Sequence, residues 1–102
     1  MGLSFRVESV AHNSVHVLTG DKSGAFMRIC KESIGKTQML GYVIPFGDTM
    51  FNSFQLTQFI VELDEAVSQR TFSDDDLEIL KKILGAAEEA RKINGYLVVL
   101  GD

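Results

Sequence analysis

The apolar residues of the second half of the chain recur at helical spacing, and this pattern constrains the fold of the 102-residue sequence most. The first stripe has members at i, i+3, i+4, i+7 and i+11, namely Leu56, Phe59, Ile60, Leu63 and Val67. A second stripe comprises Leu77, Leu80, Leu84 and Ala87. A capping residue precedes each stripe, because Asn52 is followed by Gln55 and Ser73 by Asp76 at capping-box spacing. The sequence therefore predicts a helical pair over about 53–69 and 74–93.

The first half of the chain alternates instead with the period of strands. Leu3, Phe5 and Val7 alternate with polar residues, which predicts a strand over 3–8. Further strands are predicted over 14–17, with His16 facing outward, and over 25–31 and 37–44, the last of these ending at Pro45. The run 96–100 is apolar on both faces, so we expect a final strand inserted between earlier ones.

These elements predict one α+β domain over residues 1–102. Its sheet is mostly antiparallel with four to five strands, and the helical pair covers one face. Since no apolar run reaches the length of a membrane span and the start lacks a secretory signal, we expect a cytoplasmic protein without a membrane segment. The single cysteine, Cys30, excludes an internal disulfide and fits a reducing compartment.

Negative charge is concentrated around the junction of the two predicted helices. The chain has 10 basic and 14 acidic residues, a net charge of −4. Between residues 62 and 78, Arg70 is the one base among seven acids: Glu62, Asp64, Glu65, Asp74, Asp75, Asp76 and Glu78. This acidity argues against nucleic-acid binding, which requires neutralised phosphates. The acids fit either a solvated helix start or a docking surface for a basic partner.

No motif for catalysis, a cofactor or a metal stands out. Gly35-Lys36-Thr37 is similar to the end of a phosphate-binding loop, but position 30, where that loop needs a glycine, is Cys30. Neither histidine is spaced to activate Cys30 as a nucleophile, and the His and Cys spacing makes no zinc pattern. We therefore expect no enzyme activity, no cofactor and no metal, although a small enzyme with an unfamiliar site stays open.

Two segments resemble a known class of protein. Gly47–Leu56 has the pattern Gly-Asp-Thr-x-Phe-Asn-x-x-Gln ahead of an amphipathic helix, and the chain ends in Tyr96–Asp102. Both are similar to small bacterial immunity-type proteins of polymorphic toxin systems. The resemblance implies a cytoplasmic inhibitor that binds one cognate toxin and has no catalysis of its own.

The resemblance and the acidic bias together predict a protein that neutralises a toxin through an acidic surface that fills a basic active site. The expected partner-binding residues are Asp48, Asn52, Gln55, Glu62, Glu65, Asp74 and Asp75. Capping competes with binding as the role of Asn52 and Gln55. The alternative is a non-enzymatic assembly module that forms a homo-oligomer through a sheet edge.

Overall fold

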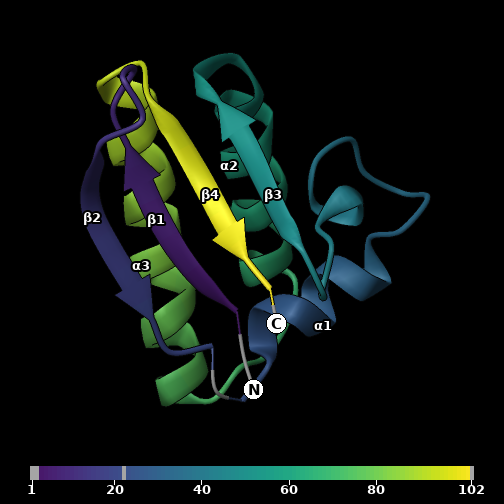
Figure 1. The fold of residues 1–102 in the computed structure, drawn as a ribbon. Coiled ribbons are helices and arrows are strands. Elements are labelled where there is room, and N and C mark those ends of the chain that lie inside the picture. Colours follow the sequence, from purple (N-terminus) through teal and green to yellow (C-terminus); the bar gives the residue numbers. More distant parts are fainter. Residues whose placement is uncertain (1–2, 22, 102) are drawn as a thin grey trace.

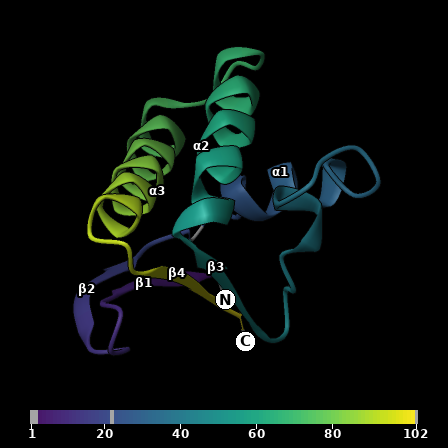
Figure 2. The ribbon, with the colours of Figure 1, turned by 90° about the horizontal axis from the view of Figure 1, so that it is seen from above.

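The computed structural model describes residues 3–21 and 23–101. Its elements in chain order are β1 (Ser4–Glu8), β2 (Ser14–Thr19), α1 (Ala25–Glu32), the 3₁₀ turn η1 (Leu40–Tyr42), β3 (Asp48–Asn52), α2 (Ser53–Ser68), α3 (Asp74–Lys92) and β4 (Tyr96–Leu100). The described residues form one antiparallel four-stranded sheet, and the helices lie on one of its faces (Figures 1 and 2). The predicted α+β class and helical pair are confirmed.

The sheet has the strand order β2-β1-β4-β3, with the last strand between β1 and β3 (Figure 1). The prediction that this strand is inserted between earlier ones is therefore confirmed, although β3 itself was not predicted. Leu97 and Val99 of β4 are fully buried and pair with strand residues that face the helices. Val98 points to the opposite face, where its register partners are Arg6 and Met50, and is 2% exposed. Burial on both faces explains why this strand is apolar throughout.

Four phenylalanines join the sheet to the helices. The Phe5 ring of β1 meets Phe26 of α1 edge to face at 5.2 Å between centroids, and Phe26 is 6.2 Å from Phe59 of α2. Phe59 is in turn 5.0 Å from Phe51 of β3. Burying each ring contributes roughly 1.5–3 kcal/mol. The core therefore depends on α1 as well as on the helical pair.

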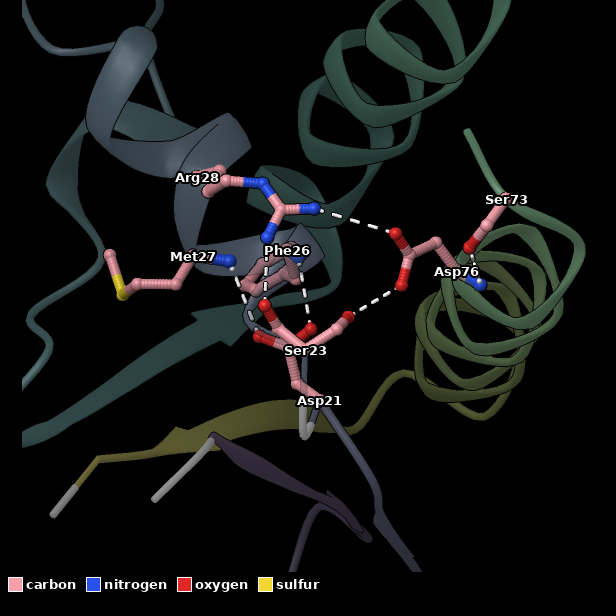
Figure 3. Close-up of polar contacts among 7 residues, drawn as sticks. All are labelled: Asp21, Ser23, Phe26, Met27, Arg28, Ser73 and Asp76. Atoms are coloured by element: carbon pink, nitrogen blue, oxygen red, sulfur yellow. Dashed lines mark hydrogen bonds and ion pairs between the residues drawn. The ribbon is translucent and has the colours of Figure 1, made fainter. Parts of the chain in front are cut away.

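Both predicted helix starts are capped, though not in the same way. At α2, Asn52 Oδ1 accepts the Gln55 N–H and Gln55 Oε1 accepts the Asn52 N–H, each at 2.9 Å, which completes a capping box. At α3, Ser73 Oγ accepts the Asp76 N–H at 3.2 Å. The Asp76 carboxylate contacts Ser23 and Arg28 instead of turning back to the cap (Figure 3).

The predicted strand over 25–31 is wrong, because this segment is helix α1. The Asp21 carboxylate accepts the N–H groups of Phe26 at 3.0 Å and Met27 at 3.3 Å, which satisfies the start of the helix (Figure 3). Phe26, Ile29 and Cys30 are buried at i, i+3 and i+4. Seven residues are too few for the apolar period to separate a helix from a strand.

The predicted strand over 37–44 is also wrong, since this segment forms a loop that contains η1. Its N–H groups at Gln38, Met39 and Leu40 donate to the Glu62 side chain rather than to a neighbouring strand. The sheet position is taken by β3, where Thr49 and Phe51 face the helices because they pair with Val99 and Leu97.

The predicted orientation of β2 is reversed. Val17 is 56% exposed and pairs with Arg6 on the open face of the sheet. His16 pairs with Val7 on the helix side, and its Nδ1 lies 3.2 Å from Glu89 Oε1 of α3. Leu18 pairs with Phe5 and packs against the core, and because side chains alternate along a strand, His16 lies on the same side as Leu18 and Val17 on the other.

Candidate protein-binding surface

The seven expected contact residues are spread over both ends of α2. Asn52 and Gln55 lie at its start, whereas Glu65 lies near its end and Asp74 and Asp75 open α3. The starts of α2 and α3 lie at opposite ends of the sheet (Figure 1). Since the 16 residues of α2 span about 24 Å, the structure does not unite these residues in one site.

Asp48, Asn52 and Gln55 differ in what remains available to a partner. Asp48 is exposed at the first position of β3. The side-chain oxygens of Asn52 and Gln55 are engaged in the capping box. A structural role thus accounts for these two residues, while Asp48 is available for contact.

Glu62, one of the expected contact residues, is buried. Its side chain accepts hydrogen bonds from the N–H groups of Gln38 (3.0 Å), Met39 (3.1 Å) and Leu40 (2.9 Å) and from Gln58 Nε2 (2.9 Å). Burial acts most strongly and raises the pKa of Glu62, but these hydrogen bonds together outweigh it and lower that pKa. Glu62 therefore anchors the loop between α1 and β3.

Four exposed acids remain around the connection between α2 and α3, and we call them the acidic end: Asp64, Glu65, Asp74 and Asp75. None of them forms a salt bridge within the described ranges. By contrast, Glu78 pairs with Lys82 at 3.6 Å, and Arg70 pairs with Glu32. Glu65 lines a surface hollow with Lys36 and Arg70, and Asp75 lines one with Lys82, so basic side chains lie nearby without forming an ion pair with either acid. The acidic end therefore has an excess of negative charge that a basic partner could meet.

Asp76 belongs to a separate polar cluster that joins α1 to α3 (Figure 3). It accepts hydrogen bonds from the Ser23 hydroxyl and from Arg28 Nη2, the latter at 3.4 Å. Arg28 also donates to the Ser23 carbonyl at 2.7 Å. Asp21, beside it, is 1% exposed, and burial raises its pKa more than its two backbone hydrogen bonds lower it. These contacts give Asp76 a structural role, so Asp76 is not counted in the acidic end.

Exposed aromatic side chains are the feature that the sequence analysis missed. Phe54 is 91% exposed, Phe46 79% and Tyr42 70%. Phe54 lies in the first turn of α2, outside the apolar stripe that begins at Leu56. Its position off the stripe is the sequence signal from which its exposure could have been predicted. Aromatic residues are enriched in protein interfaces, so their exposure here favours a binding surface.

Among the described residues, Cys30 and a charged surface hollow are candidates for a reactive or ligand-binding role. Cys30 is buried, and burial raises the pKa of its thiol, which stays protonated at neutral pH. A surface hollow beside the ends of α1 and α2 carries both signs of charge, from Glu32, Lys36, Glu65 and Arg70. Within 3–21 and 23–101, no group of three or more His, Cys, Asp or Glu side chains is placed to hold a metal.

Comparison with known proteins finds no matching family model, no matching curated protein and no matching solved structure. In the part of the chain that the structure describes, no helix has the length and apolar character needed to cross a bilayer. Functional inference therefore starts from the exposed surface, with its acidic end and its aromatic side chains.

Proposed function

We propose that this chain is an immunity-type protein that binds and neutralises a cognate bacterial toxin. The observation that carries the proposal is the acidic end, where Asp64, Glu65, Asp74 and Asp75 are exposed with no salt bridge among the described residues. The exposed aromatic residues support protein binding independently of charge. The resemblance of Gly47–Leu56 and Tyr96–Asp102 to immunity proteins supplies the class of partner.

The acidic end would inhibit by occupying a basic active site. A nuclease toxin binds phosphate groups with basic side chains, and carboxylates compete for the same donors. The unpaired negative field would also speed association, since opposite charges steer two proteins together before contact. Glu65, Asp74, Asp75 and Asp48 are the expected contacts, while Asn52 and Gln55 cap α2 and Glu62 anchors the loop between α1 and β3.

Capture with matched charge variants tests this proposal. The tagged chain and a variant with Asp64→Asn, Glu65→Gln, Asp74→Asn and Asp75→Asn are used as baits in lysate of the native host. Glu88→Gln, an exposed acid on α3 without a described ion pair, is the control. A basic protein retained by the wild type and the control, but lost from the fourfold variant, is the expected partner.

Co-expression then decides whether binding is neutralisation. The captured protein alone should stop growth of a test bacterium, and the wild-type chain should restore growth. A captured protein that is harmless when expressed would contradict the proposed function. Equal rescue by the fourfold variant would contradict the role of the acidic end.

A homo-oligomeric assembly module is the second candidate, and strand β2 favours it. β2 is an edge of the sheet, contains no Asp, Glu, Lys or Arg, and exposes Val15 and Val17. Edge strands of soluble proteins usually carry charges or proline that block pairing with another chain. Size-exclusion chromatography with light scattering tests it: a dimer twice the 11.3 kDa chain mass that Val17→Lys converts to a monomer would establish assembly, and a wild-type monomer would exclude it.

A further inference from the structure

We propose that the outward face of α2 is the docking face for a partner protein that presents an apolar pocket and a basic patch about 15 Å apart. This inference rests on the proposed binding function and specifies which surface binds and what the partner must offer. The separation follows from the helical rise between Phe54 and the Asp64–Glu65 pair, which lie about ten residues apart.

The outward face of α2 comprises the residues that a helical period places opposite the buried stripe: Phe54, Thr57, Val61, Asp64, Glu65 and Ser68. All six are exposed. The first half of the face is apolar, with Phe54 at 91% and Val61 at 45% exposure. The second half carries the two carboxylates and leads to Asp74 and Asp75 at the start of α3.

Phe54 is the anchor that this face offers. Four other phenylalanines are buried in the core, namely Phe5, Phe26, Phe51 and Phe59. Phe54, unlike these four, does not pack in the core. An aromatic ring on a helix inserts into a hydrophobic pocket at modest entropic cost, and such rings dominate the affinity of many interfaces. The partner therefore needs an apolar pocket opposite the first turn of α2.

The charges on this face select a basic protein over other occupants. The face has no Lys or Arg, so a second copy of the chain that docks through the same face would oppose Asp64 and Glu65 with like charges or with apolar groups. Nucleic acid and anionic lipid would be repelled in the same way. A protein that presents Lys or Arg opposite the second half of the helix is the occupant with complementary charge.

The outward face of α3 provides an internal comparison. After the acidic first turn with Asp74 and Asp75, it carries Glu78, Lys81, Lys82, Glu88, Arg91 and Lys92, which mix both signs, and Glu78 pairs with Lys82. A face with both signs of charge is typical of a helix surface that stays exposed to solvent. Negative charge without a basic residue on the same face is therefore a property of α2 and not of the helical pair.

Photo-crosslinking tests which face binds. The probe is p-benzoylphenylalanine, placed at position 54 in the full chain and expressed in the native host. The matched control places it at exposed Gly85 of α3, where an added Cβ atom meets no heavy atom within 4 Å. We expect a crosslink to one basic protein from position 54 and none from position 85. A crosslink from 54 to a second copy of the chain or to an acidic protein, or no crosslink from 54, would overturn the proposal.

Binding of the purified crosslinked partner to defined variants completes the test. Phe54→Ala should weaken the affinity at least about 30-fold, as expected for an anchor residue. Asp64→Lys combined with Glu65→Lys should weaken it at least about tenfold and reduce its dependence on salt. Glu88→Lys, the control on α3, should stay within about twofold of the wild type. Thermal unfolding checks that each variant remains folded.

The outcomes separate this inference from the proposed function. An affinity of Phe54→Ala within about twofold of the wild type overturns the docking face even if the partner is a toxin that the chain neutralises. A partner that binds through Phe54 but does not inhibit growth overturns neutralisation and retains the docking face.

Discussion

A single carboxylate, that of Glu62, sets the path of the loop between α1 and β3. Three consecutive N–H groups, from Gln38 to Leu40, donate to it at 2.9–3.1 Å. The sequence showed only a glutamate on an amphipathic helix, because its backbone partners lie more than 20 residues away. Pattern reasoning at the level of residues finds local contacts such as the Asn52–Gln55 box and misses those that tertiary packing creates.

Removing the Glu62 carboxylate should destabilise the protein strongly. We expect Glu62→Ala to lower the free energy of unfolding by about 2–4 kcal/mol, because three N–H groups lose their acceptor. Glu62→Gln keeps one acceptor oxygen and should cost about 1–2 kcal/mol. Urea unfolding measures both, with exposed Glu65→Gln as the control that stays within about 0.5 kcal/mol. A loss as small for Glu62→Ala as for the control would contradict the anchoring role.

Acid should weaken the protein partly through Glu62. Its pKa in the folded protein lies below the ordinary value of 4.5, so the unfolded chain binds the proton more readily. The stabilisation is present above about pH 4.5 and is lost as the pH falls toward the folded pKa. Urea midpoints measured from about pH 7 to about pH 3 should fall less steeply in Glu62→Gln than in the wild type. Parallel curves would show that Glu62 does not carry this dependence.

At the scale of elements, the sequence predicted best where local signals agreed. Caps and a long apolar period specified α2 and α3, and burial on both faces placed β4 inside the sheet. The short segments 25–31 and 37–44 were mistaken for strands because acceptors elsewhere in the chain, Asp21 and Glu62, take their N–H groups. β3 was overlooked because the cap of α2 follows it directly.

The cap of α2 gives a prediction at this scale. Asn52→Ala should cost about 1 kcal/mol of unfolding free energy, because the Gln55 N–H loses its acceptor. Asn52→Gly should cost only a few tenths, about 0.3 kcal/mol, since glycine tolerates the cap conformation and exposes the N–H to water. Chemical denaturation of both variants distinguishes them. Equal losses would indicate that the Asn52 side chain contributes through its sheet position rather than as a cap.

At the scale of the whole molecule, charge and exposed aromatic side chains mark the surface that we propose binds a partner. The sequence located the acidic residues but could not separate the exposed Asp64 and Glu65 from buried Glu62 or from Asp76, which is held by Arg28. It also missed exposed Phe54, because exposure depends on which face the rest of the chain covers. The proposed binding surface therefore depends on the tertiary structure, while its net charge is visible in the sequence.

The salt dependence of the association rate should show whether the partner is recognised by charge. The association rate with the captured partner should fall at least about tenfold between about 50 mM and about 500 mM NaCl, because added ions screen the acidic end. Surface plasmon resonance gives this rate directly. A rate that is independent of salt would contradict steering by the acidic end.

Stoichiometric inhibition tests the central proposal most directly. Purified chain is titrated into a fixed amount of the captured partner while the toxic activity of that partner is followed. We expect activity to fall linearly to zero at a molar ratio near one, with the Asp64→Asn, Glu65→Gln, Asp74→Asn and Asp75→Asn variant requiring a large excess. Full activity of the partner at saturating wild-type chain would contradict neutralisation.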